Sequence, residues 1–284
     1  MSLLLLVDLD GVVYRGADPV PGVAGVLADR AARGDAVVYV TNNSMHYRGD
    51  YVSRLTAMGA PITPDTVISS SRATALHLRD HEPEVRRVLA LGAGGLEREL
   101  HDVGLEVVTA AHAATRMHQE GIDGAEAAGH PEAVVVGLDP NVTYLRLAAA
   151  ADCIRAGARF IATNRDPVYP TERGLRPGAG TLVAAIEATT GVVPLSIGKP
   201  APLLLEIAAE TVGRDPRDAI MIGDGIGTDL AAANVVGARC VVMLTGVTTA
   251  GMLAALPSDE QPTATARNAA ELMAALDRLA GPST

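Results

Sequence analysis

Two carboxylates separated by a single residue are the most informative chemical feature of this chain. Asp8 and Asp10 follow the apolar run Leu3–Val7 and precede Gly11. Residues at positions i and i+2 of an extended chain point to the same side, so these carboxylates repel each other unless a cation lies beside them. Because parallel sheets bind ligands at the carboxyl ends of their strands, the spacing predicts a metal-assisted carboxylate site.

Three more polar segments follow apolar runs that have the character of strands. They are Thr41, Asn42 and Asn43 after residues 36–40, Lys199 after residues 195–197, and Asp224 with Asp229 after residues 219–222. Carboxylate oxygens suit Mg²⁺, whereas zinc favours His or Cys ligands. Hydroxyl, amide and backbone donors at a strand-to-helix junction suit phosphate oxygens, and a lysine adds a point charge. The set predicts a magnesium site beside a phosphate site, with an Asp as a competent nucleophile toward phosphorus.

The elements that must position these residues alternate between strands and helices. At the start of the chain we expect strands over 3–7, 36–40 and 66–69 and helices over 23–33 and 46–58. Toward the end we expect strands over 195–197, 219–222 and 240–244 and helices over 201–212, 229–235 and 269–279. This alternation predicts an α/β fold with a doubly wound, Rossmann-like parallel sheet, to which both ends of the chain contribute.

A second alternation lies between these two parts. We expect strands over 88–91, 105–108, 133–136 and 159–162, helices over 95–101 and 143–156, and a loop or weak helix over 111–130. Its length suits an independent smaller α/β domain inserted into the first. We therefore expect residues 1–81 and 179–284 to form the core domain and residues 82–178 to form the inserted domain.

Composition narrows the classes of function. The net charge of −10 and the lack of a basic stripe disfavour a nucleic-acid surface. Cys153 and Cys240 are far apart without a pairing pattern, which indicates a reduced, cytoplasmic compartment. No stretch approaches the roughly 20 apolar residues of a membrane span. We therefore expect a small-molecule partner and neither nucleic acid nor a membrane.

The four segments resemble the four motifs of the haloacid dehalogenase (HAD) superfamily of phosphatases. The residues that carry the resemblance are Asp8-Leu9-Asp10-Gly11, Thr41-Asn42-Asn43-Ser44, Lys199-Pro200 and Gly223-Asp224-Gly225-Ile226-Gly227-Thr228-Asp229. The insertion is similar to the large α/β cap domain of class IIA members, which include phosphatases of the NagD type, p-nitrophenyl phosphatases and phosphoglycolate phosphatases. The resemblance covers essentially the whole chain.

The resemblance implies a role for each residue. Asp8 would be the nucleophile and a metal ligand. Asp10 would protonate the leaving oxygen, later activate water, and bind the metal through its carbonyl. Asp224 would complete the metal site, while Asp229 would orient its water shell or Lys199. The residues implied to hold the phosphoryl group are Thr41, Asn42, Asn43 and Lys199.

Two expectations concern the loops around this site. Many relatives carry bulkier residues in the fourth motif, so Gly225 and Gly227 predict a more mobile loop there. The cap of such enzymes covers the substrate, and the candidates for contact with the leaving group are Asp139, Asn141, Thr163, Asn164 and Arg165. For most of these five a structural role is the favoured interpretation.

The resulting hypothesis is a Mg²⁺-dependent phosphatase that hydrolyses a small organic phosphomonoester through an aspartyl-phosphate on Asp8. The alternatives are phosphoryl transfer to another acceptor, another HAD reaction such as dehalogenation, and a non-catalytic regulatory protein that binds a phosphorylated metabolite. The sequence leaves the substrate open among glycerol phosphate, phosphoglycolate, pyridoxal phosphate and nucleotides. The resemblance also implies a possible homodimer formed through the cap.

Overall fold

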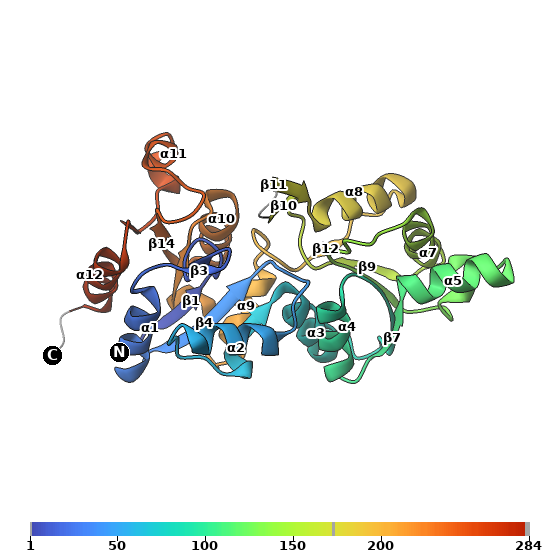
Figure 1. Ribbon diagram of the computed structural model, residues 1–284, viewed down its shortest axis with the longest axis horizontal. Coiled ribbons are helices and arrows are strands. Elements are labelled where there is room, and N and C mark those ends of the chain that lie inside the picture. Colours follow the sequence, from blue (N-terminus) through green and yellow to red (C-terminus); the bar gives the residue numbers. More distant parts are fainter. Residues whose placement is uncertain (1, 172–173, 282–284) are drawn as a thin grey trace. The chain divides into compact units, whose positions relative to one another are not determined.

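The computed structural model describes residues 2–171 and 174–281 and divides into two compact units. The core unit comprises Met1–Thr41, Gly49–Ile68 and Lys199–Thr284, and the inserted unit comprises Asn42–Arg48 and Ser69–Gly198. Met1 and residues 282–284, at the ends of the expected core domain, lie outside the described residues. Each unit is built around its own parallel sheet (Figure 1).

The core unit contains a six-stranded sheet with the order β15-β14-β13-β1-β4-β5. Its strands are β1 (Leu4–Val7), β4 (Ala36–Thr41), β5 (Val67–Ser69), β13 (Ala219–Gly223), β14 (Arg239–Met243) and β15 (Ala264–Ala266). Strand β1 pairs in parallel with β13 on one side and with β4 on the other, so Val7 lies opposite both Ile222 and Tyr39. The predicted doubly wound α/β fold is confirmed, and the carboxyl ends of three neighbouring strands share one edge.

Helices cover both faces of this sheet, which explains why β1 is apolar throughout. Helices α1 (Val23–Ala32) and α12 (Ala269–Ala280) contact each other and one face (Figure 1), while α9 (Leu203–Glu210) and α10 (Ala231–Val236) contact the other. All four residues of β1 are buried. A strand buried on both faces reads as a continuous hydrophobic run. The remaining helices of the core unit are α2 (Arg48–Ala57) and α11 (Ala250–Ala254).

A tight turn and a small hairpin follow β1. The carbonyl of Leu9 accepts hydrogen bonds from the amides of Val12, Val13 and Tyr14, and Gly11 adopts a φ of 78°. The hairpin consists of β2 (Tyr14–Arg15) and β3 (Asp18–Pro19). Its strands of two residues each are too short to show an alternating pattern, so no local sequence signal predicts them.

The inserted unit holds a five-stranded parallel sheet with the order β12-β9-β8-β6-β7. Its strands are β6 (Arg87–Leu91), β7 (Glu106–Thr109), β8 (Ala133–Val136), β9 (Arg159–Ala162) and β12 (Leu195–Ser196). Its helices are α3 (Ser70–His81), α4 (Gly94–Asp102), α5 (Ala110–Glu120), α6 (Gly124–Ala127), α7 (Tyr144–Arg155) and α8 (Ala179–Thr190). A hairpin of β10 (Val168–Thr171) and β11 (Gly174–Pro177) completes it.

One expectation about these elements is wrong. The strand expected over 195–197 does not join the core sheet, because β12 pairs in parallel with β9 of the inserted unit. A two-residue strand carries too little pattern to indicate its partner. Of the two alternatives expected over 111–130, a loop or a weak helix, the helical one is confirmed by α5 and α6, which begin at the side-chain caps Thr109 and Asp123.

By its contacts the inserted unit also takes in the flanking helices α3 and α8. The limits 82 and 178 therefore stay a prediction about the segment that folds as a domain. Among the described residues, no helix is both long and apolar enough to cross a membrane.

Candidate active site

Asp8 and Asp224 occupy equivalent places on neighbouring strands. Each is the first residue after its strand, β1 or β13, and the amide of Asp8 donates a hydrogen bond to the carbonyl of Ile222 at 2.8 Å. Both residues are buried, with exposed fractions of 8% and 7%. Parallel pairing of the two strands therefore brings together residues that lie more than 200 positions apart in the sequence.

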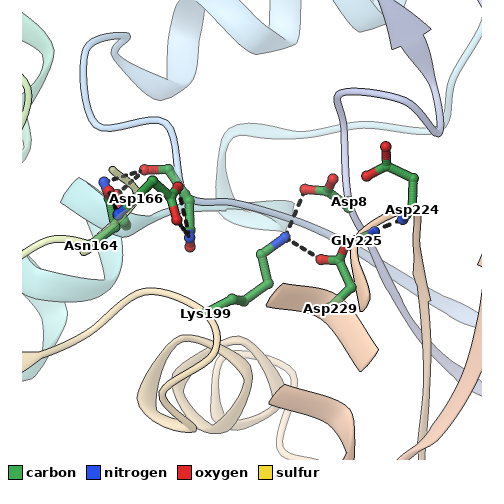
Figure 2. Close-up of polar contacts among 9 residues, drawn as sticks. Asp8, Asn164, Asp166, Lys199, Asp224, Gly225 and Asp229 are labelled. Atoms are coloured by element: carbon green, nitrogen blue, oxygen red, sulfur yellow. Dashed lines mark hydrogen bonds and ion pairs between the residues drawn. The ribbon is translucent and has the colours of Figure 1, made fainter. Parts of the chain in front are cut away.

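Lys199 joins this pair through its ammonium group. Its Nζ lies 2.8 Å from Oδ1 of Asp8 and 2.6 Å from Oδ1 of Asp229 (Figure 2). The Lys199 side chain is 3% exposed. Lys199 is the only lysine among the 23 Lys and Arg residues of the chain. Its being the one lysine of the chain is a further sequence signal, beyond its place in the third motif, that singles out Lys199.

Asp229 braces the loop that carries Asp224. Its Oδ2 accepts hydrogen bonds from the amides of Asp224 at 3.1 Å and Gly225 at 2.9 Å, while its Oδ1 contacts Lys199 (Figure 2). A Cβ atom at Gly223 would lie 2.2 Å from the Cβ of Asp229, so the loop closes this tightly only with glycine there. Both carboxylate oxygens of Asp229 are thus engaged within the protein, as an orienting residue requires.

The Asp224 carboxylate is enclosed by Gly11 of the first motif and by Gly246 and the amide of Val247, which lie outside the four motifs. Its Oδ2 accepts a hydrogen bond from the amide of Val247 at 2.7 Å. A Cβ atom would lie 2.2 Å from this oxygen at Gly11 and 1.7 Å from it at Gly246. Each of these glycines is separated from Asp224 by more than 20 residues, so no local sequence pattern predicts that they pack against its carboxylate.

The charge of this cluster is unbalanced. Carboxylate oxygens of Asp8, Asp224 and Asp229 all lie within 4.8 Å of one another, whereas Lys199 supplies a single positive charge. Burial raises the pKa of Asp8 well above its usual range; Lys199 opposes this effect and Asp229 adds to it. Burial also raises the pKa of Asp224 to about 6. When all three carboxylates are ionised, the cluster carries a net negative charge that a bound cation would neutralise.

Lys199 responds in the opposite sense. Burial by itself would lower its pKa, but the carboxylates of Asp229 and Asp8 raise it above its ordinary value. The side chain consequently stays protonated across the physiological range. A fixed ammonium between two carboxylates suits the binding of an anionic group. The oxygen donors of the three aspartates match the preference of Mg²⁺ for hard ligands.

Asp10 differs from Asp8 in its surroundings. Its side chain is exposed, and it forms an isolated β-bridge with Tyr14 at the base of the hairpin. The acidic group formed by the described residues includes Asp8, Asp224 and Asp229 and does not include the Asp10 side chain. An exposed carboxyl group can exchange protons with water, which is compatible with the predicted acid/base role.

The predicted phosphate-binding residues Thr41, Asn42 and Asn43 divide between the two units. Thr41 is the buried last residue of β4, at the same sheet edge as Asp8. Asn42 and Asn43 belong by their contacts to the inserted unit. The Nδ2 of Asn42 lies 3.1 Å from Oδ2 of Asp166, and Oδ1 of Asn43 accepts a hydrogen bond from the amide of Met45 at 2.9 Å.

Several of the candidate leaving-group residues make contacts within the inserted unit. Asp139 pairs with Arg146 at 2.8 Å, and its Oδ1 accepts a hydrogen bond from the Asn141 amide at 2.8 Å. Arg165 pairs with Glu187 at 2.6 Å, and both Thr163 and Asn164 are buried. Such contacts are typical of residues with a structural role, which is the interpretation favoured for most of these candidates.

Comparisons with known proteins agree with this architecture. Residues 5–106 match the family model of haloacid dehalogenase-like hydrolases, and residues 196–272 match that of HAD hydrolase-like proteins. The acid sugar phosphatase of Staphylococcus haemolyticus is 36% identical over 258 residues, covering 91% of this chain and 90% of that protein.

Two solved structures are similar throughout. The p-nitrophenyl phosphatase from Archaeoglobus fulgidus superposes with a TM-score of 0.84 at 28% identity, covering 96% of this chain and 99% of that one. The glycerol phosphate phosphatase from Mycobacterium tuberculosis in complex with magnesium gives a TM-score of 0.79 at 34% identity, covering 95% of this chain and 75% of that one.

These relatives are phosphatases by name, and the predictions of a class IIA HAD fold and of a hydrolase acting on phosphoric monoesters are confirmed. The chain belongs to the haloacid dehalogenase-like hydrolases.

Proposed function

We propose that this phosphatase hydrolyses small organic phosphomonoesters with the help of Mg²⁺, through a phosphoryl intermediate on Asp8. The observation that carries the proposal is the buried cluster of three carboxylates, two of which contact the ammonium of Lys199. A nucleophilic Asp and an anionic phosphate repel each other, so they approach only where cations neutralise both. The cluster joins the nucleophile to one such cation, Lys199.

The residues divide the reaction between them. Oδ1 of Asp8 is held by Lys199, and among the described residues no hydrogen bond engages its Oδ2. Oδ2 would attack phosphorus while Asp10 gives a proton to the leaving oxygen, and Asp10 would then take a proton from the attacking water. Asp229 holds the ammonium of Lys199 in place.

Asp8, Asp224 and the carbonyl of Asp10 would hold the metal ion. Bound there, Mg²⁺ supplies positive charge against the carboxylates and the phosphoryl oxygens. The hydroxyl of Thr41, the segment Asn42–Asn43 and Lys199 would receive those oxygens. Catalysis of phosphoryl transfer depends mainly on such positioning and electrostatic stabilisation.

The proposed substrate class is supported by the names of the relatives, which are acid sugar phosphatase, p-nitrophenyl phosphatase and glycerol phosphate phosphatase. We propose a small phosphorylated metabolite of this kind, in a protein that the sequence predicts to be cytoplasmic. A homodimer formed through the cap is a further prediction, which light scattering after gel filtration checks.

The test measures phosphate release from p-nitrophenyl phosphate and from a panel of phosphorylated sugars, glycerol phosphate and nucleotides, with Mg²⁺ and with EDTA. We expect Asp8→Asn to lose at least about 10³-fold in kcat, because the nucleophile is gone. An Asp10→Asn variant quenched in acid should retain labelled phosphate on the protein. Release that is unaffected by EDTA and by Asp8→Asn would contradict the proposal, and no release from any ester would favour a regulatory protein.

A further inference from the structure

The segment that follows β9 holds a residue from the second motif. Asn164 donates a hydrogen bond from Nδ2 to the carbonyl oxygen of Asn42 at 2.8 Å, and Oγ of Ser70 donates to the same oxygen at 2.7 Å. The Nδ2 of Asn42 in turn lies 3.2 and 3.1 Å from the two carboxylate oxygens of Asp166. Asn164 thus contacts the main chain of Asn42 and Asp166 contacts its side chain (Figure 2 labels Asn164 and Asp166). Main chain and side chain of Asn42 are therefore both fixed.

The same segment also holds the residue that precedes Lys199. The amide of Gly198 donates to the carbonyl of Thr163 at 2.8 Å, which continues the pairing of β12 with β9. A Cβ atom at Gly198 would lie 2.6 Å from Oδ1 of Asn42 and 2.9 Å from the Cβ of Asn164. This close approach requires glycine, and it brings three distant segments of the inserted unit into contact.

We call Thr163, Asn164 and Asp166 the clamp, and it is itself braced. Oδ1 of Asn164 accepts a hydrogen bond from the amide of Asp166 at 3.1 Å. The carbonyl of Asp166 accepts from the amide of Gly180, in the first turn of α8, at 2.9 Å. Thr163 and Asn164 are buried, with exposed fractions of 0% and 4%. A braced, buried segment can hold its neighbours in one geometry.

We propose that Asn164 and Asp166 are positioning residues of the phosphate site. Asn42 directly follows Thr41 and Gly198 directly precedes Lys199 in the chain, so the clamp fixes the chain next to both predicted phosphate ligands. The inference rests on the proposed function, because it concerns the geometry of that same site. On this proposal Asn164 positions Asn42 instead of contacting the leaving group, and the Asn42 side chain anchors its own segment to Asp166.

The test compares variants by steady-state kinetics with p-nitrophenyl phosphate and by inhibition with inorganic phosphate. Asp166→Ala removes the acceptor of the Asn42 amide, and we expect a loss of roughly 10- to 100-fold in kcat/KM because ligand groups shift slightly. The KM and the inhibition constant of phosphate should rise together. Asp166→Asn keeps an acceptor oxygen and should recover most of the loss, whereas Asn164→Ala should resemble Asp166→Ala.

A matched control is Asp152→Asn. Asp152 is also a half-buried carboxylate of the inserted unit, and its Oδ2 accepts a hydrogen bond from the amide of Gly124 at 3.0 Å. We expect this variant to keep its KM and its inhibition by phosphate even where its melting temperature falls. An Asp166→Ala protein with unchanged KM and unchanged inhibition by phosphate would overturn the proposal.

Hydrogen exchange separates this proposal from the proposed function, since it needs no activity. Peptides that cover residues 38–45 and 196–202 should exchange faster in Asp166→Ala than in the wild type, while those over β8 should not. Unchanged exchange at both segments would overturn the clamp, even in an active enzyme. If the wild type hydrolyses no ester but Asp166→Ala still exchanges faster than the wild type at both segments, the proposed function is refuted and the clamp is retained.

Discussion

The core unit and the inserted unit each contain a polar cluster, and the two clusters balance charge differently. In the core unit three buried aspartates share one lysine, and burial raises the pKa of both Asp8 and Asp224. In the inserted unit a single half-buried carboxylate, Asp166, meets the amide of Asn42, while the Asn42 carbonyl receives two donors. The first cluster carries excess negative charge, which suits a bound cation and chemistry, whereas the second joins one carboxylate to a neutral side-chain amide, which suits a positioning role.

The largest effect that would test this contrast comes from removing the lysine. Lys199→Met leaves Asp8 and Asp229 buried without their counter-charge, and such a loss typically costs about 3–5 kcal/mol of stability. We expect a corresponding fall in the free energy of unfolding by urea, together with loss of activity. The control is Arg217→Met at the exposed pair with Asp215, which should change stability little. Equal free energies of unfolding for the two variants would show that Asp8 and Asp229 do not depend on the positive charge of Lys199.

A smaller effect on stability is expected from Asp224→Asn, which should stabilise the protein at neutral pH, whereas Lys199→Met destabilises it. Burial raises the pKa of Asp224 in the folded protein to about 6, so the folded state holds this proton more tightly than the unfolded state. The resulting stabilisation is complete below the ordinary pKa and is lost as the pH rises through about 6.

Asp224→Asn removes that dependence. In EDTA we expect the melting temperature of the variant to gain on the wild type between pH 4.5 and 7.5 by on the order of a few degrees. Added Mg²⁺ should stabilise the wild type and leave the variant unchanged. A constant difference across this pH range would contradict the charge imbalance deduced for the cluster.

The smallest expected effect is an absence of reaction. Lys199 is the only lysine, its side chain is 3% exposed, and its pKa is raised by Asp229 and Asp8. We expect an amine-reactive acetylating reagent at pH 8 to modify the α-amino group of the native protein but not Lys199. Mass spectrometry should find the second acetyl group only after denaturation. Rapid labelling of native Lys199 would mean that the ammonium is neither buried nor held by the carboxylates.

The sequence was informative where pattern and position coincide. Continuous apolar runs predicted β1, β4 and β13, because a strand covered on both faces must be apolar throughout. Asp8 and Asp224 could be predicted at one edge for the same reason, since parallel strands end together. The strand β12 was predicted, but its sheet was predicted wrongly because two residues carry no periodicity, and the short strands of the hairpin after β1 were not predicted.

By itself the sequence determined the class of chemistry, because the types and spacing of Asp8, Lys199 and Asp224 are local properties of the chain. Tertiary structure alone decided which charges meet and which segments hold them. Asp166 lies 124 residues from Asn42, whose side-chain amide donates to it, and Gly246 lies 22 residues from Asp224, whose carboxylate packs against it. Such contacts arise from packing between elements, for which a linear pattern has no counterpart.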